Sequence, residues 1–177
     1  MPNFSNNLII LVRSFDAIAR TIHAGMLAWY IVRGKKPRKV YNHAEIYVND
    51  LVSGALPNGV INRSYEKAFE DGKKRELLFY DMDLDDEQKI KLYKFCLDQG
   101  GKGYEYINFV RHLIDIFFGK WKGPKGKKAE KRVYCIEYAA MGINEVIPGS
   151  IKKPWRINPI QFKKYCDKNF KLMIRNI

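Results

Sequence analysis

The feature that most constrains the fold is a short stretch in which polar and apolar residues alternate next to a turn signal. Residues His43–Val48 alternate with a period of two, which is typical of a β-strand with one buried face. Asn49 and Asp50 follow, and such a pair favours the tight turn of a β-hairpin. A second strand is expected at Leu51–Leu56, and after a break at Pro57–Gly59 the pattern resumes over Val60-Ile61. The sequence therefore predicts a meander of small antiparallel strands.

Further elements are expected on both sides of this meander. Helices are indicated by helical spacing of apolar residues, by acidic starts with glycine past the end, or by an N-cap before proline. They are Phe15–Val32, Leu84–Gln99, Tyr104–Phe118, Cys135–Val146 and a C-terminal helix that opens at Asn158-Pro159. One more strand is expected over Arg75–Met82. The order of strands and helices predicts an α+β fold, in a single domain over residues 1–177.

Composition narrows the class of protein. A chain of 177 residues with 46% hydrophobic and 14% aromatic residues has enough apolar mass for a core, which excludes a disordered protein. Its three cysteines are an odd number and none forms a C-x-x-C pair, so neither a disulfide framework nor a metal site is expected. The apolar run Leu8–Val12 is too short for a signal peptide, and no stretch is long enough to cross a bilayer. A cytoplasmic protein without a cofactor is therefore expected.

Two residues, His43 and Cys135, are candidates for catalysis. His43 begins a strand after a breaker loop, and Glu45 lies two residues on, on the same face of that strand. Cys135 opens a helix-compatible segment, where the helix dipole favours a thiolate that a nearby histidine could stabilise. The alternatives are a polar residue at a strand edge and a buried thiol that acts as a small hydrophobic residue. Cys96 and Cys166, which lie within predicted helices, fit the second alternative better.

Two other motifs are incomplete. His43-Ala44-Glu45 matches the start of the zinc deaminase signature, but the P-C-x-x-C that completes this signature is absent from the sequence. Gly100–Gly103 lacks the spacing and the preceding strand of a phosphate-binding loop. No metal ligand set is therefore assigned.

Five short motifs follow one another along the chain over roughly residues 40 to 165. They are Tyr41–Val48, Gly59-Val60, Gly103–Tyr106, Tyr134–Ala140 and Ile157–Pro159. Their order resembles the circularly permuted branch of the NlpC-type papain-like cysteine hydrolase superfamily. This branch includes bacterial and phage hydrolase-like proteins and the lecithin retinol acyltransferase group. In it the histidine strand precedes the cysteine helix, the reverse of papain. The usual Cys-Ser-Glu of the family reads Cys135-Ile136-Glu137 here.

The resemblance implies a papain-like fold, in which a small antiparallel sheet or barrel packs against helices. It implies Cys135 as the nucleophile and His43 as the general base of a hydrolase or acyltransferase that acts on an amide or ester bond. The third residue, which orients the histidine, stays open among Glu45, Asn58 and Ser53. Counting residues across a two-residue hairpin turn places Ser53 on the face opposite to His43.

The oxyanion of such a reaction is expected to bind backbone N–H groups at the start of the Cys135 helix. The hydroxyl of Tyr134 or Tyr104 is a candidate for a further donor. Packing in the core is the alternative for both tyrosines.

The charge of the chain is concentrated in loops. The net charge is +13, and the run Arg33–Lys39 contributes five basic residues without an acid just before His43. The run Gly119–Arg132 contributes seven basic residues and one acid just before Cys135. Solvated surface loops are the ordinary explanation of such runs. The alternative is recruitment of an anion, for which the candidates are Lys35, Lys36, Arg38, Lys39, Lys125, Lys127 and Lys128.

The positive charge indicates an anionic partner. An anionic peptide or lipid substrate is expected, with an acidic membrane surface as a further partner. A basic nucleic-acid-binding module is the runner-up function, although the basic residues lie in loops and match no known nucleic-acid-binding motif. A catalytically silent lipid-binding protein is the third alternative.

Overall fold

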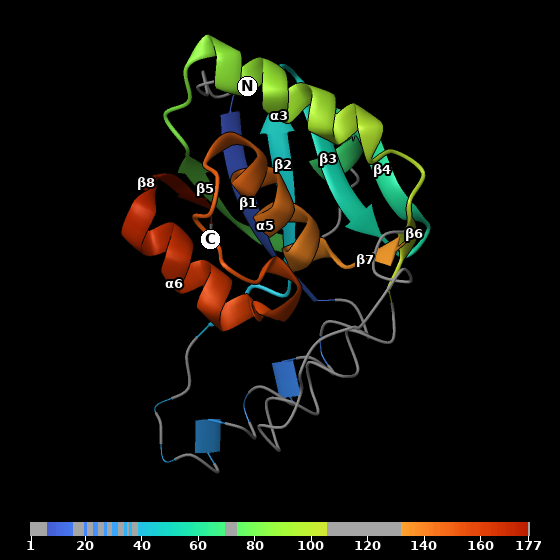
Figure 1. Cartoon of the computed structure of the whole chain (residues 1–177). Coiled ribbons are helices and arrows are strands. Elements are labelled where there is room, and N and C mark those ends of the chain that lie inside the picture. Colours follow the sequence, from blue (N-terminus) through green and yellow to red (C-terminus); the bar gives the residue numbers. More distant parts are fainter. Residues whose placement is uncertain are drawn as a thin grey trace.

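A computed structural model describes residues 7–15, 39–69, 74–105 and 132–176, with isolated positions between 20 and 36. Within these residues the chain has an α+β fold, with a six-stranded antiparallel sheet and four α-helices (Figure 1). The expected α+β class is confirmed. The strands of the sheet are β1 (Asn7–Ser14), β2 (His43–Val48), β3 (Leu51–Leu56), β4 (Gly59–Ser64), β5 (Arg75–Asp81) and β8 (Lys171–Asn176). The helices are α2 (Tyr65–Phe69), α3 (Asp86–Asp98), α5 (Cys135–Val146) and α6 (Pro159–Asn169), with a 3-10 turn at Pro154–Arg156.

The sheet has the order β4-β3-β2-β1-β5-β8. The predicted hairpin is confirmed, since Asn49 and Asp50 both have positive φ, 47° and 62°, as a tight two-residue turn requires. Ile46 then lies opposite Ser53. Residues that lie opposite each other share a face, so Ser53 points away from the face that carries His43, as the count across the turn predicted.

The strand β1 runs through the middle of the sheet, between β2 and β5. Its apolar run is buried on both faces, since Leu8, Ile10 and Val12 pack on one side while Ile9 and Leu11 pack on the other. Continuous apolar sequence is typical of a strand covered on both faces. The strand β1 was not predicted, because the run Leu8–Val12 was considered only as a possible signal peptide.

Different helices pack on the two faces of the sheet. The helices α3, α5 and α6 lie on one face, where they enclose the larger hydrophobic cluster (Figure 1). The short helix α2 covers part of the other face, where Ala68 belongs to the same hydrophobic cluster as Val52 and Phe79. The helix α5 is buried along most of its length, which places its first residue, Cys135, against the sheet.

Local sequence explains where the helices begin. Asp85 and Asn158 are the N-caps of α3 and α6, and each forms a reciprocal capping box with a glutamine at the third helical position. The predicted start of α6 is confirmed, and α3 begins at Asp86, two residues after the predicted Leu84. The helix α5 begins after Tyr134, whose side chain forms no cap hydrogen bond.

Some predictions were wrong, and others concern residues outside the described part of the chain. Tyr104 was expected to open a helix, but it belongs to a short strand, β6 (Gly103–Tyr104), which pairs in parallel with β7 (Arg132–Val133). Arg132 therefore lies in a strand and not in the basic loop. The remainder of the helix expected to residue 118 and of the loop after it lie outside the described residues, as does most of the helix predicted for 15–32. The strand β8 and the helix α2 were not predicted.

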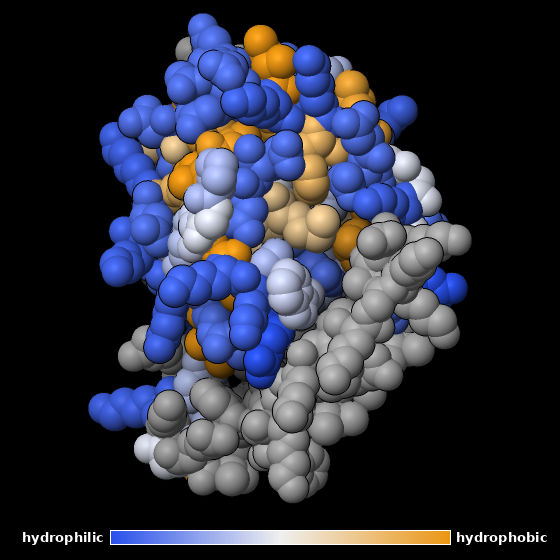
Figure 2. All heavy atoms as spheres, in the orientation of Figure 1, coloured by the Kyte–Doolittle hydropathy of each residue, from blue (hydrophilic) through white to orange (hydrophobic). Residues whose placement is uncertain are grey.

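No helix among the residues that the structure describes combines the length and the apolar character needed to span a bilayer. Hydrophilic side chains dominate α3 and α6 on the face shown in Figure 2.

Candidate active site

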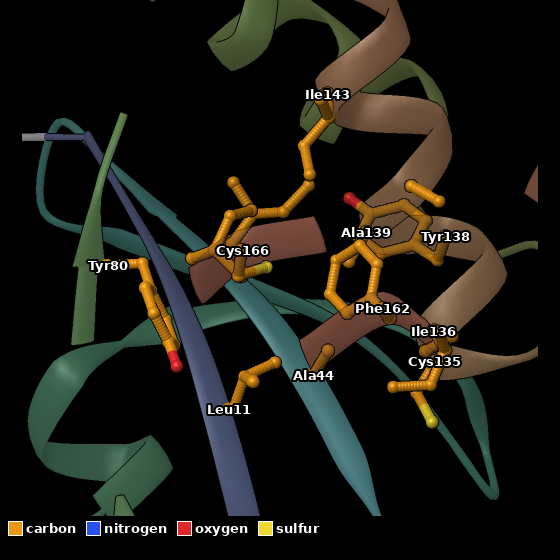
Figure 3. Packing of buried hydrophobic residues seen from close by; sticks show 14 of the residues in the cluster. Leu11, Ala44, Tyr80, Cys135, Ile136, Tyr138, Ala139, Ile143, Phe162 and Cys166 are labelled. Atoms are coloured by element: carbon orange, nitrogen blue, oxygen red, sulfur yellow. The ribbon is translucent and has the colours of Figure 1, made fainter. Parts of the chain in front are cut away.

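Two chain segments that are far apart in the sequence meet at the start of β2. Cys135 is the first residue of α5 and is 4% exposed. Its sulfur lies 3.8 Å from the backbone oxygen of Asn42. Figure 3 shows the sulfur pointing away from the apolar side chains of α5, such as Tyr138 and Ala139. The thiol therefore lies beside the residue that precedes His43.

The Cys135 thiol interacts directly with the His43 imidazole. Burial raises the pKa of this thiol, but the charge of His43 and a hydrogen bond with it lower the pKa and outweigh burial. The backbone N–H of Ala44 and the Tyr104 hydroxyl lower it further by hydrogen bonding. The net result is a pKa below the ordinary thiol value, which favours a thiolate.

The neighbours of His43 in turn shift the pKa of its imidazole. Burial lowers the pKa of His43, but the Cys135 thiolate and the Glu45 carboxylate together raise it above the ordinary histidine value. A thiol with a lowered pKa beside an imidazole with a raised pKa favours a thiolate–imidazolium ion pair. This is the state in which a cysteine nucleophile is activated.

Glu45 holds the histidine from its own strand. The Nε2 atom of His43 lies 2.9 Å from Oε1 of Glu45, which leaves Nδ1 as the ring nitrogen for Cys135. The Glu45 side chain is 3% exposed, and its pKa lies below the ordinary value. Burial opposes this shift, whereas the hydrogen bonds and charges of His43 and Arg63 produce it.

Arg63 compensates the charge of Glu45. One guanidinium nitrogen of Arg63 donates to both carboxylate oxygens of Glu45, at 2.7 Å each. Arg63 lies on β4 opposite Val52, which lies opposite Tyr47, so it shares the sheet face of Glu45. When His43 is protonated, the side chains of His43, Glu45 and Arg63 form a row of alternating charge that extends from β2 across β3 to β4.

The absence of a side chain at Gly54 makes room for this row. A Cβ atom at Gly54 would lie 3.0 Å from Cγ and 3.2 Å from Cδ of Glu45. The pairing of β2 with β3 also ends at Ile46, one residue after Glu45 along β2 toward the turn. The Glu45 carboxylate therefore passes over β3 toward Arg63 on β4.

The Tyr104 hydroxyl reaches Cys135 because β6 and β7 run side by side. Tyr104 lies opposite Val133, two residues before Cys135. The chain before β6 is bound to β4, since the N–H of Val60 donates to the oxygen of Lys102 at 2.7 Å. Gly59 permits this approach, because a Cβ there would lie 2.5 Å from that same oxygen.

Three other residues singled out from the sequence lie elsewhere. Ser53 is buried on the opposite face, where its hydroxyl donates to Asn62 at 2.5 Å and lies 2.5 Å from the Tyr138 hydroxyl. Asn58 is exposed in the turn between β3 and β4. Tyr134 is buried in the core, and its hydroxyl donates to the backbone oxygen of Ile157. Of the three candidates for the residue beside His43, the structure brings only Glu45 to it.

The basic residues proposed for recruitment are mostly outside the described residues. Lys35, Arg38, Lys125, Lys127 and Lys128 belong to that group. Lys36 is exposed. Lys39 pairs with Glu76 at 3.1 Å, so its charge is partly compensated within the fold.

Arg63 is the residue that sequence reasoning missed. The third strand of the meander was followed only to Ile61, although β4 continues to Ser64. A two-residue turn at Pro57 and Asn58 places Leu56 opposite Gly59. Counting onward from that turn would have placed Arg63 opposite Val52, on the face of Glu45.

A second buried carboxyl lies in the first turn of α5. Glu137 is 4% exposed, and burial raises its pKa to about 7 although the backbone N–H of Tyr134 donates to it. The charge of Glu105 raises it further. Glu137 therefore caps the backbone at the start of α5.

No group of three histidine, cysteine or acidic side chains in the described part of the chain is arranged to hold a metal ion. In comparisons with known proteins, no family model matches the chain, and no curated protein matches its sequence.

Proposed function

We propose that this chain is a cysteine hydrolase or acyltransferase with a permuted papain-like fold, acting on an amide or ester bond of an anionic peptide or lipid. The observation that carries the proposal is the contact between Cys135, at the start of α5, and a histidine that a buried carboxylate holds. The order of the elements supports it, because the strand of His43 precedes the helix of Cys135.

The reaction proceeds in two steps. The Cys135 thiolate attacks the carbonyl carbon and forms a C–S bond, and the carbonyl electron pair moves onto the oxygen. The oxyanion then collapses, the bond to the leaving group breaks, and the His43 imidazolium gives its proton to the departing amine or alkoxide. Neutral His43 next takes a proton from water or from an acceptor, which attacks the thioester and releases the Cys135 thiolate.

The start of α5 offers donors for the oxyanion. N–H groups in the first turn of a helix have no partner within that helix. Glu137 accepts a hydrogen bond from the N–H of Tyr134, so the N–H of Cys135 is the candidate donor. The Tyr104 hydroxyl, which contacts the sulfur, is the second candidate donor.

Glu45 and Arg63 act behind the histidine. The Glu45 carboxylate accepts the N–H of the Nε2 atom and so keeps Nδ1 of His43 directed at the sulfur. Arg63 keeps Glu45 ionised in a buried position. We assign Glu45 as the orienting residue and Arg63 as a positioning residue that acts through it.

The proposal is tested by trapping the acyl-enzyme. The full chain is mixed with p-nitrophenyl acetate and quenched in acid, and the acetylated residue is identified by peptide mass spectrometry. We expect acetyl on Cys135, its loss in Cys135→Ala, and its retention in Cys96→Ala, a matched buried cysteine on α3. Acetylation that is unchanged in Cys135→Ala would contradict the proposal.

The runner-up function has its own test. A basic nucleic-acid-binding module would bind random-sequence duplex DNA tightly at low salt, with an affinity that falls steeply as salt rises. A gel shift measures this binding. Tight duplex binding by a chain that forms no acyl-enzyme would favour this second function over the enzyme.

A further inference from the structure

A cavity of about 310 Å³ lies on the helix-covered side of the sheet, away from Cys135. One wall is α6, and the others are β5, the start of β8 and the segment 39–41. None of the residues assigned to the Cys135 site lines it. The segment 39–41 leads into Asn42, whose backbone oxygen lies 3.8 Å from the Cys135 sulfur, so the cavity and the Cys135 site share this stretch of chain although β5 lies two strands from β2.

The interior of the cavity is aromatic and aliphatic. Five of its lining residues are buried apolar or aromatic side chains. They are Tyr30, Val40, Tyr41, Leu78 and Tyr80. Small-molecule sites are mostly apolar and hold roughly 300–1,000 Å³, so this cavity is at the small end of that range. It suits a ligand with a compact apolar body rather than a long chain.

The charged side chains that line the cavity come from α6 and from Lys39, and they are positive on balance. Lys39, Lys163 and Lys164 line it together with a single acid, Asp167. Asp167 is already occupied, since it accepts from the Tyr80 hydroxyl at 2.5 Å and from Lys163 at 2.7 Å and 2.9 Å. The charge of Asp167 is therefore unable to balance the other two lysines.

Lys164 is the cation that remains for a ligand. Lys39 pairs with Glu76 outside the cavity, and Lys163 pairs with Asp167. Lys164 is exposed and has no ion pair within the part of the chain that the structure describes. One uncompensated ammonium beside an apolar cavity is complementary to one negative charge on an apolar body.

We propose that this cavity binds a small organic monocarboxylate with an aromatic or branched aliphatic body. The body lies against Tyr41, Tyr80 and Leu78, and the carboxylate lies at Lys164. Inorganic phosphate fits less well, because it is strongly hydrated and has no apolar body to fill the interior.

Binding to the full chain is measured by isothermal titration calorimetry with 3-phenylpropionate, its neutral analogue 3-phenylpropanol, and inorganic phosphate. We expect the carboxylate to bind more tightly than the alcohol, and phosphate to bind weakly. Lys164→Gln should weaken the carboxylate by about fivefold, the upper range for an exposed ion pair, and leave the alcohol unchanged. Lys168→Gln is the matched control, because Lys168 is an exposed lysine of α6 outside the cavity lining.

A second variant tests the place of the apolar body. Ile160→Trp should fill the cavity and remove the binding of both phenyl compounds, since Ile160 lines it. The inference is overturned if 3-phenylpropionate does not bind the wild-type chain, if phosphate binds as tightly, or if Lys164→Gln and Lys168→Gln behave alike. If Ile160→Trp does not fold, the comparison of Lys164→Gln with Lys168→Gln still tests the inference, because both residues are exposed.

Discussion

The three cysteines of this chain are all buried and free, but their surroundings differ in charge. Burial raises the pKa of Cys96 to about 11, and it also raises the pKa of Cys166. The pKa of Cys135 is lowered, because a histidine lies beside it. Apolar burial therefore protects two of the thiols, and the ion pair with His43 activates the third.

Removal of the Glu45 charge should lower the pKa of His43. Glu45→Gln keeps the shape of the side chain but loses one of the two negative charges that raise this pKa against burial. The imidazolium should then lose its proton at lower pH, and the alkaline limit of turnover should move to lower pH as well. NMR titration of the His43 ring measures the change.

The matched control for Glu45→Gln is Glu76→Gln. Glu76 is another carboxylate bound by basic side chains, Arg13 and Lys39, at a different place in the sheet. Glu76→Gln should leave the titration of His43 unchanged. An identical His43 pKa in wild type and Glu45→Gln would contradict the role of Glu45.

Removal of Arg63 should destabilise the fold in a manner that depends on pH. Arg63→Gln removes one of the two cations that hold the buried Glu45 carboxylate, His43 being the other, and breaking a buried pair costs about 3–5 kcal/mol. Glu45 has a lowered pKa in the folded state, so its contribution is present above the unfolded pKa of about 4.3 and is lost as pH falls through the folded pKa. The stability gap between variant and wild type should therefore be widest at neutral pH and shrink in acid.

Urea unfolding at several pH values measures this gap. Arg13→Gln is the comparison, since the Arg13–Glu76 pair is more exposed and should contribute less than about 1 kcal/mol. Equal losses in the two variants, or a gap for Arg63→Gln that does not change with pH, would count against the buried pair.

At the scale of elements, the sequence pattern was most informative where the periodicity is local. The bounds of α5, the hairpin turn at Asn49 and Asp50, and the start of α6 are as predicted, because caps, turns and apolar spacing act over a few residues. The strand β1 was missed, since a run buried on both faces has no alternation to detect. Among the described strands, β8 pairs with β5 alone, a partner about 90 residues away, so no local signal revealed it.

The candidate site was predicted in part for the same reason. His43 and Glu45 share a strand, and Cys135 begins a helix, so local pattern was sufficient to single them out. Arg63 reaches Glu45 only because the register of three strands brings it across and Gly54 leaves space. Such a contact depends on tertiary structure, which spacing along the chain does not encode.

Gly59 is expected to be the most sensitive glycine near the site. It has φ of 109°, and a Cβ there would lie 2.5 Å from the backbone oxygen of Lys102. Gly59→Ala should therefore combine backbone strain of about 1–3 kcal/mol with a clash that separates β4 from the strand of Tyr104. Gly149→Ala is the control, because Gly149 has φ of 73° with nothing within 4 Å. Urea unfolding should show the larger loss for Gly59→Ala, and an equal loss would contradict the clash.

At the scale of the whole molecule, the net charge of +13 should influence which reagents reach Cys135. The rate ratio of anionic iodoacetate to neutral iodoacetamide at Cys135 should be higher than that of free glutathione at low salt. It should fall as salt rises, because the screening length shortens to about 8 Å at physiological ionic strength. Peptide mass spectrometry measures both rates. A ratio equal to that of glutathione at every salt concentration would argue against recruitment of anions.

The central claim is that His43 turns the buried Cys135 into a reactive thiolate. The most direct test is the rate of Cys135 alkylation by iodoacetamide against pH, in wild type and in His43→Gln. In wild type the rate should rise with an apparent pKa below the ordinary thiol value, since the His43 charge and hydrogen bond lower the pKa of Cys135. In His43→Gln burial still raises this pKa, and only the smaller effects of the Ala44 and Tyr104 hydrogen bonds lower it, so the curve should move to higher pH. Superimposable curves for the two proteins would contradict the claim.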